Sequence, residues 1–123
     1  MRNCQRAAGE AATPAKPIDL VHLTRHTFGD CDLEREVLRL FVTQSSLYVA
    51  RLMAATSRKA WLEAAHTIKG SARSIGAWGV ADAAERAEAE PFRKGSSGVA
   101  RAAARLQEQV EEANGFIEQL ISV

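Results

Sequence analysis

The sequence predicts an all-α fold: an antiparallel four-helix bundle with a short extra N-terminal helix. Aromatic residues make up only 6% of the 123 residues, and no segment alternates apolar and polar residues for long enough to form a strand. Apolar residues recur instead at intervals of three and four, and only three prolines interrupt the chain. A chain of this length is sufficient for one domain with a modest core.

The chain is predicted to divide into an arm and a single folded domain. Residues 1–16 mix Ala, Thr, Pro, Gly and charged residues without periodicity, so we expect a disordered arm there and the helical domain at residues 17–123. No run of 18 uncharged apolar residues occurs, which excludes a membrane span, and the segment Ala7 to Ala12 carries Gly and Glu where a signal peptide would be apolar.

Charge and cysteine content narrow the functional class. The formal net charge is +1 and no cluster of Lys and Arg with interleaved aromatics occurs, so nucleic acid is not an expected partner. Cys4 and Cys31 lack metal-type spacing, and Cys4 lies in the predicted arm, so neither a disulfide nor a metal site is expected. These features predict a protein of a reducing compartment, the cytoplasm.

The first two helices are marked by capping residues. Asp19 can cap a helix from Leu20 to Phe28, and Gly29 can end it in a left-handed conformation. Asp30 and Asp32 can cap a second helix that continues to about residue 54. Its apolar stripe consists of Val37, Leu40, Phe41, Leu47 and Tyr48.

Three further helices follow. The third is predicted from Arg58 to Ile75, after a break at residues 55–57, and it stops at Gly76. The fourth spans residues 77–90 and ends before Pro91, and residues 92–98 form a Gly- and Ser-containing loop. The last helix has alternating spacings of four and three along one seam, made of Val99, Ala103, Leu106, Val110, Ala113, Ile117 and Leu120.

The third helix carries the candidate reactive residue, His66. At about 100° per residue, the apolar side chains of this helix share one face, and His66 lies with Lys69 and Arg73 on the outward stripe. Two cations near the imidazole could offset the charge of an anion bound there. Gly70 lowers helix stability by about 1 kcal/mol relative to Ala. This loss of stability is understandable if a bulky group must approach the ring. The buried face consists of Trp61, Ala65, Ile68, Ala72 and Ile75.

The segment His66-Thr-Ile-Lys-Gly-Ser-Ala-Arg-Ser-Ile-Gly resembles the signature of histidine-containing phosphotransfer (HPt) domains of bacterial two-component phosphorelays. The match consists of the phosphoacceptor His, Lys at i+3, Gly at i+4, a small residue at i+5 and a second Gly at i+10. Glu88 stands where the family commonly has an acidic residue or Gln, and Ile18-Asp19-Leu20 and Gly29-Asp30 also look like the family. The resemblance covers roughly residues 17–120.

The resemblance implies a role for each site residue. His66 would be phosphorylated on Nε2, and Glu88 would accept a hydrogen bond from Nδ1 and so fix the tautomer. A docking patch around His66 would use an apolar residue of the first helix such as Leu20 or Leu23. Its other members would be Glu63, Lys69, Gly70, Arg73 and Ser74.

The resemblance also implies the partners: receiver domains of response regulators and a hybrid histidine kinase. The receiver would supply the aspartate and Mg²⁺, so the chain itself is expected to need no cofactor. It contains no Gly-rich phosphate loop, H-E-x-x-H or G-x-S-x-G motif, which argues against an enzyme in its own right. We expect a monomer, because a four-helix bundle uses the last helix's seam internally and leaves little for dimerisation.

Two alternatives remain at this point. The chain could be a helical adaptor that binds receivers or kinases without carrying phosphate, although His66 with Lys69 argues against it. His22 and His26, at i and i+4, could bind zinc with Cys31 or Asp30, but a single such pair is most often two surface residues.

Overall fold

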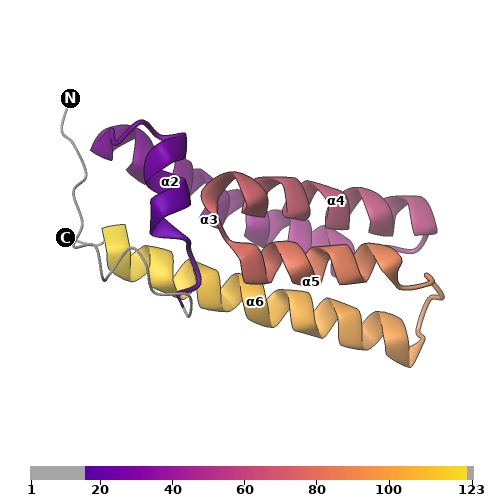
Figure 1. The fold of residues 1–123 in the computed structure, drawn as a ribbon. Helices are drawn as coiled ribbons and strands as arrows, with labels where there is room; N and C mark the ends of the chain where they lie inside the picture. The colour runs from indigo at the N-terminus through magenta and orange to yellow at the C-terminus, as the bar shows by residue number, and fades with distance from the viewer. Residues whose placement is uncertain (1–15, 122–123) are drawn as a thin grey trace.

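The computed structural model describes residues 16–121 and confirms the all-α prediction. The described residues form five helices and no strand. Four long helices run antiparallel to their neighbours, and the short α2 lies across one end of the bundle (Figure 1). The helices are α2 (Leu20–His26), α3 (Cys31–Met53), α4 (Arg58–Ile75), α5 (Trp78–Ala89) and α6 (Ser97–Ile121).

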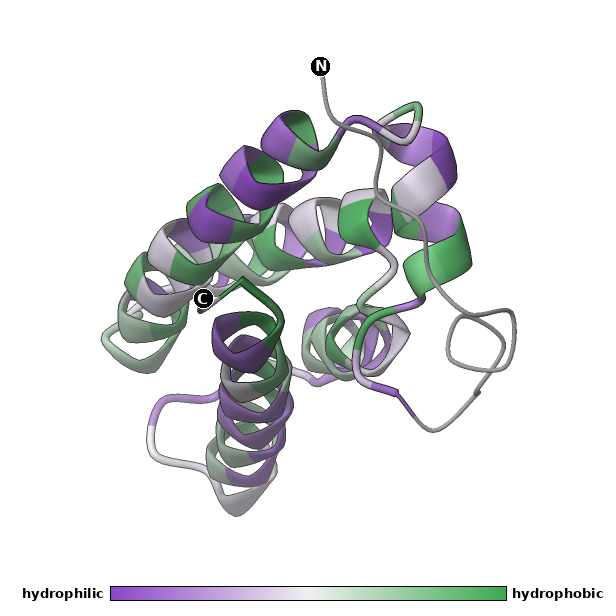
Figure 2. Cartoon of the chain, turned by 90° about the vertical axis from the view of Figure 1, so that its left-hand side faces the viewer, coloured by the Kyte–Doolittle hydropathy of each residue, from purple (hydrophilic) through white to green (hydrophobic). Residues whose placement is uncertain are grey.

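The four long helices surround one hydrophobic core. Each packs against the next in chain order, α3 also packs against α6, and the interface between α4 and α5 is the most extensive. Figure 2 looks along the bundle and shows hydrophobic residues recurring along each helix. The α5 residues Ala83, Ala84 and Ala87 are buried, and their small side chains allow α5 to lie close to α4. The largest fully buried side chains of the long helices are Leu38, Leu52, Trp61, Ile68, Ile75, Val80, Leu106 and Ile117.

Helix α4 begins and ends at the residues that its capping pattern predicts. The Ser57 side chain accepts a hydrogen bond from the Ala60 backbone N–H at 3.1 Å, which satisfies one free donor of the first turn. At the other end Gly76 has φ of 78°, the left-handed conformation that ends the helix. Helix α6 begins at Ser97, inside the predicted loop, because the Ser96 hydroxyl accepts from the Val99 backbone N–H at 3.2 Å and caps it.

Helix α2 ends two residues earlier than predicted. Thr27 follows its last residue, and the Thr27 hydroxyl donates to the Leu23 carbonyl at 2.9 Å. Both Phe28, with φ of 55°, and Gly29, with φ of 73°, are left-handed, so the chain turns sharply into the Asp30 cap of α3. Phe28 is 90% exposed. A left-handed Phe is uncommon because its Cβ crowds the backbone, and sequence patterns therefore favour Gly29 alone.

Helix α3 separates its apolar residues into two stripes. Leu38, Phe41 and Leu52 face the core, whereas Leu40 and Leu47, predicted to belong to the same apolar stripe, are 57% and 44% exposed. The spacing of Leu33, Val37, Leu40, Gln44 and Leu47 defines a second row, called here the outer stripe. The two rows are offset by one residue, or about 100°, so only one of them can face the bundle interior.

Cys31, the first residue of α3, is disulfide-bonded, so the expectation of unpaired cysteines is wrong. A disulfide requires two Cα atoms about 6 Å apart in the folded chain, a condition that sequence spacing does not reveal. Cys4 and the rest of the predicted arm as far as residue 15 lie outside the described residues. None of the helices between residues 16 and 121 combines the length and apolar composition needed to cross a membrane.

Asp19 fixes α2 to the corner between α4 and α5. Its side chain accepts from the His22 backbone N–H at 3.1 Å and from Trp78 Nε1 at 2.9 Å. Its own backbone N–H donates to the Gly76 carbonyl at 2.8 Å. A Cβ on Gly76 would lie 2.9 Å from Asp19 Cβ, so this position needs glycine for space as well as for its φ. These contacts place α2 beside the end of α4.

The Asp19 contacts predict a pH-dependent contribution to stability. The Trp78 indole N–H, followed by the His22 backbone N–H, holds the pKa of Asp19 below its ordinary value of 3.8. Because the folded-state pKa is the lower one, this stabilisation is present above about pH 4 and is lost as the pH falls through the folded-state pKa. Asp19→Asn keeps a capping side chain but removes the charge of the acceptor for the Trp78 and His22 N–H groups, so it should lower the free energy of unfolding by about 0.5–1 kcal/mol at pH 7. Urea unfolding should show a smaller difference at pH near 3. A difference that stays the same at both pH values would contradict this assignment.

Candidate functional site

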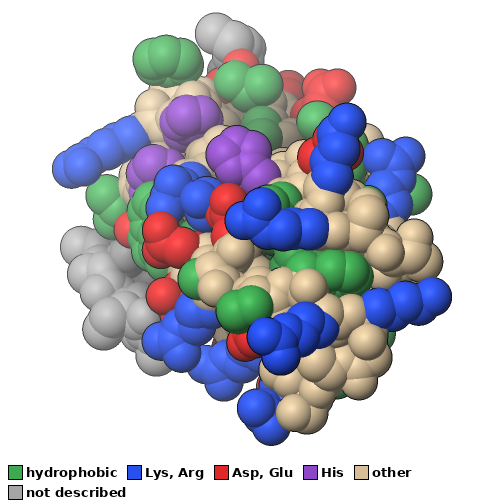
Figure 3. Space-filling model, turned by 90° about the vertical axis from the view of Figure 1, so that its right-hand side faces the viewer, with side chains coloured by type: hydrophobic (Ala, Val, Ile, Leu, Met, Phe, Trp, Pro, Cys, Tyr) green, Lys and Arg blue, Asp and Glu red, His purple; other side chains and the backbone are tan. Residues whose placement is uncertain are grey.

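His66 lies on the outward face of α4. Its side chain is 73% exposed, whereas Ala65 and Ile68 on either side of it in sequence are buried. All three histidines of the chain gather on one face of the molecule, with acidic and basic side chains beside them (Figure 3). The imidazole of His66 is therefore open to a reaction partner of protein size.

Glu88 on α5 brings a carboxylate to the histidine. Glu88 Oε2 lies 3.6 Å from His66 Nδ1, a distance that brings charge close but exceeds a hydrogen bond. The hydrogen bond expected from Nδ1 is thus not formed in this structure. No described side chain pairs with Nε2, the nitrogen on the other side of the ring.

Lys69 pairs with the same carboxylate. Lys69 Nζ lies 2.6 Å from Glu88 Oε1, a close ion pair without the angular geometry of a hydrogen bond. The Lys69 side chain is only 15% exposed and that of Glu88 22%. Lys69 thus lies between α4 and α5, held in place by its ion pair with Glu88.

Arg73 also pairs with α5. Arg73 Nη2 lies 3.6 Å from Glu85 Oε1, and both side chains are more than half exposed. An exposed pair of this kind contributes at most about 1 kcal/mol, so Arg73 can exchange partners readily. The sequence did not single out Glu85, although it lies three residues before Glu88 and hence on the same face of α5. The structure thus pairs Lys69 and Arg73 of α4 with Glu88 and Glu85 of α5. The sequence of α4 alone does not reveal this pairing.

Gly70 leaves open space beside His66. A Cβ added at Gly70 would meet no atom within 4 Å, so packing inside the protein does not require glycine here. Glu63, one turn before His66, is exposed. Ser74 is half-buried, and its hydroxyl donates to the Ser71 carbonyl at 2.7 Å.

The apolar residues near this surface differ from those expected. Leu20 and Leu23 are 1% and 0% exposed, so they belong to the core, and the prediction that they complete the docking patch is wrong. They face inward because α2 packs its apolar side against α4. The exposed large apolar residues of the first two helices and their connection are Val21, Phe28, Leu33, Leu40, Leu47 and Met53.

A shallow groove runs between the outer stripe of α3 and α4. It has a volume of about 100 Å³. Leu40 supplies exposed apolar surface on its α3 side, and Ser74 belongs to its α4 wall. The groove therefore adjoins the predicted docking residues. Its lining consists of Val37, Leu40, Phe41, Gln44, Ser71, Ser74 and Ile75.

The His22 and His26 rings stack, with centroids 5.6 Å apart, and His22 also contacts the edge of Trp78. Within residues 16–121, no group of three or more His, Cys, Asp or Glu side chains is arranged to hold a metal ion. Cys31, one of the two suggested additional ligands beside Asp30, is disulfide-bonded. The pair is thus a ring stack beside α5.

The tryptophans, Phe116 and the predicted seam of α6 contribute to the packing of the bundle. Trp61 is 1% exposed and its Nε1 donates to the Ala87 carbonyl at 2.7 Å, whereas Trp78 lies at the edge. Phe116 packs partly buried against the core. The α6 seam is also internal, since Ala103, Leu106, Val110, Ala113 and Ile117 are buried.

A helical bundle that presents one exposed histidine, with a lysine one turn further on and a carboxylate on the next helix, has the architecture of a histidine phosphotransfer carrier. The family model of the Hpt domain matches residues 36–116, which is more than half of the chain. The chain belongs to the Hpt domain family, and the matched range includes His66, Lys69, Gly70 and Glu88. Comparisons with curated proteins and with solved structures gave no match. Membership in this family places the protein in phosphotransfer of two-component signalling.

Proposed function

We propose that His66 accepts a phosphoryl group from the aspartate of one receiver domain and passes it to the aspartate of another. The observation that carries the proposal is the exposed imidazole of His66 on an Hpt domain, with open space at Gly70 and the Glu88 carboxylate near Nδ1. The chain would act as a carrier rather than as an enzyme, in the cytoplasm where receivers act.

In the proposed transfer, the lone pair of His66 Nε2 attacks the phosphorus of the partner's aspartyl phosphate. A P–N bond forms as the P–O bond to the aspartate breaks, and the electron pair of that bond stays on the regenerated carboxylate. The ring keeps its proton on Nδ1, and Glu88 stabilises the positive charge that develops there. The same steps in reverse deliver the phosphoryl group to the next receiver. Mg²⁺ would belong to the receiver, and the chain itself would need no cofactor.

Lys69 and Arg73 would act at different stages. Lys69 is held by Glu88 at 2.6 Å and is mostly covered, so it supplies positive potential beside the phosphohistidine without moving far. Arg73 is exposed and its pair with Glu85 is loose, so it is free to reorient toward an approaching receiver. We expect its charge mainly to raise the encounter rate, an effect that added salt weakens.

The receiver would dock over the α3–α4 groove and the surface around His66. Exposed Leu40 supplies apolar contact, while Gly70 and Ser74 give close approach to α4. Glu63 and Arg73 lie at the rim of this surface. A small interface suits a carrier that must release one receiver, such as that of a hybrid kinase, before it binds the next. We propose that the carrier works as a monomer.

A second candidate is an adaptor that binds receivers without carrying phosphate. The outer stripe favours this alternative, because Leu33, Leu40 and Leu47 offer an apolar surface that does not depend on His66. Binding alone therefore does not separate the two candidates, and the test must follow the phosphoryl group.

The test is to incubate the protein with receivers carrying radiolabelled aspartyl phosphate. The carrier function predicts that label moves to this chain and that it is acid-labile and base-stable, as phosphohistidine is. A second, unlabelled receiver should then remove it. If receivers from the source organism bind the chain but none transfers label to it, the adaptor is the better description.

Glu88 gives a prediction about the histidine's tautomer. Glu88→Ala should reduce the population of the Nδ1–H form and slow phosphorylation about threefold, since a polar interaction of this kind contributes about 1 kcal/mol or less. Nitrogen NMR of the imidazole measures the first effect and label transfer the second. Glu85→Ala is the matched control, because Glu85 contacts Arg73 and not the ring. Equal effects from the two variants would show that general negative charge on α5 matters, and not Glu88 itself.

A further inference from the structure

A second site lies at the end of the bundle away from α2. There the turn from α3 to α4, the loop from α5 to α6 and the first turns of α6 enclose a pocket of about 340 Å³. It shares no residue with the surface around His66. The lining residues are Leu52, Met53, Ala54, Ala55, Thr56, Trp61, Phe92, Lys94, Gly95, Ser96, Val99, Ala100 and Ala103.

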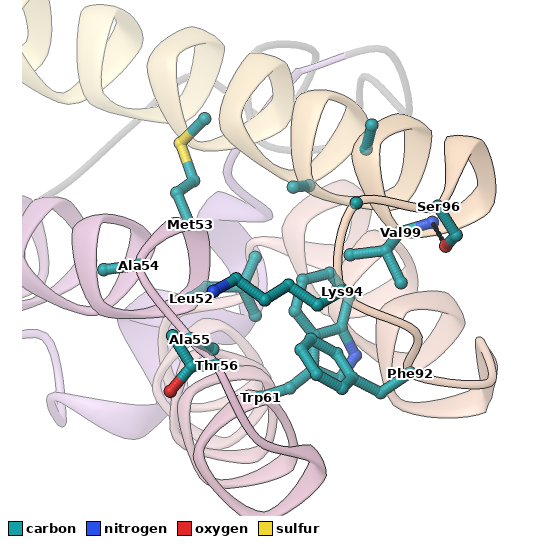
Figure 4. Close-up of a pocket in the computed structure, with 13 residues that line it drawn as sticks. Leu52, Met53, Ala54, Ala55, Thr56, Trp61, Phe92, Lys94, Ser96 and Val99 are labelled. Atoms are coloured by element: carbon teal, nitrogen blue, oxygen red, sulfur yellow. Dashed lines mark hydrogen bonds between the residues drawn. The ribbon is translucent and has the colours of Figure 1, made fainter.

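The inner wall of the pocket is aromatic and aliphatic. The rings of Trp61 and Phe92 lie next to one another, with centroids 5.6 Å apart (Figure 4). Trp61 is 1% exposed and its Nε1 is bonded to the Ala87 carbonyl, so the indole forms the floor of the pocket next to the half-buried Phe92. Leu52 and Ala103 are buried and Val99 is half-buried. The wall thus suits an apolar or aromatic ligand body.

Of the described residues that line the pocket, only Lys94 is charged. Its side chain extends from its loop across the pocket toward the end of α3 (Figure 4). No described carboxylate pairs with Lys94. Glu90, the nearest acidic residue in sequence, instead lies against Gly98 on α6. Figure 3 views this end of the bundle and shows Lys and Arg side chains spread over it; the exposed ones nearby in sequence are Arg51, Arg58, Lys59, Arg93 and Arg101.

We propose that this pocket binds a small free carboxylate with an apolar body, either a medium-chain aliphatic or an aryl-substituted acid. Its volume lies at the lower end of the range of about 300–1,000 Å³ typical of ligand sites. The ligand's hydrocarbon would contact the half-buried Phe92 and Val99 over the Trp61 floor, and its carboxylate would pair with Lys94 at the mouth. Binding would bring the α5–α6 loop and the end of α3 together. The proposal is independent of the proposed phosphotransfer function.

The chain carries its own reporter for a test. It has two tryptophans, so a Trp78→Phe background leaves Trp61, in the pocket wall, as the only indole fluorophore. Titration with 4-phenylbutyrate should give a saturable change in Trp61 emission at submillimolar concentration. The uncharged analogue 4-phenylbutanol should bind about tenfold more weakly, since it forms no charge-assisted bond to Lys94.

Variants locate the binding site. Lys94→Gln should weaken 4-phenylbutyrate about tenfold, whereas Lys59→Gln, at the same end but outside the lining, should leave it unchanged. Ala100→Phe adds bulk at the rim from an exposed position and should abolish binding, with circular dichroism confirming the fold. The proposal is overturned if Trp61 shows no saturable response at millimolar ligand, or if Lys94→Gln and Ala100→Phe bind as well as the parent.

Discussion

Replacing His66 with Gln should lower the rate of phosphoryl transfer from a receiver at least about a hundredfold, because the variant has no ring nitrogen able to form the P–N bond. Gln matches the imidazole in approximate size and polarity and is a good helix former. Since the His66 side chain is 73% exposed and forms no hydrogen bond with any residue from 16 to 121, the fold should tolerate the change. The free energy of unfolding should change by no more than about 0.5 kcal/mol.

The matched control is His26→Gln. His26 is also exposed but lies on α2, where its ring stacks on His22 and contacts no α4 or α5 carboxylate. Radiolabel transfer and urea unfolding should be measured for both variants. Transfer should persist in His26→Gln and disappear in His66→Gln, while both stay folded. Persistent label in His66→Gln would place the phosphoryl group on another residue, and the proposed mechanism would then be wrong.

The bounds of the helices could be predicted from the sequence where interactions within one helical turn determine them. The bounds of α4 follow from the Ser57 hydroxyl and from the left-handed Gly76, both of which act within one turn of the helix end. The outward position of His66 follows from the period of the helix, since Ile68 and Ala72 fix the opposite face as buried.

The parts of the site that depend on tertiary contacts could not be predicted. Nothing local to α4 indicates that Lys69 would be covered by Glu88, because the distance between them is set by how α5 packs. The family resemblance implies Leu20 or Leu23 in the docking patch, but α2 packs these residues against α4, a tertiary contact that the sequence does not specify. The structure instead exposes Leu40, which the apolar pattern of α3 groups with core residues.

Substitution of Gly70 should show that glycine at this position lowers the stability of the fold but keeps open space beside His66. Gly70→Gln should slow transfer from a receiver roughly a hundredfold, because a long side chain at i+4 displaces the phosphoryl donor from the geometry needed for attack. The same change should raise the free energy of unfolding by about 0.5–1 kcal/mol, since Gln is a better helix former than Gly. Nothing within 4 Å of a Gly70 Cβ opposes the substitution.

Gly115→Gln separates these two effects. Gly115 also lies inside a helix, is exposed and has no atom within 4 Å of an added Cβ, but it is on α6, away from His66. Both variants should therefore unfold at higher urea concentration than the parent protein, and only Gly70→Gln should lose transfer. If Gly70→Gln transferred phosphate as fast as Gly115→Gln, the open space would have no role in docking. If it were less stable than the parent, glycine would be required by the helix itself and not by the partner.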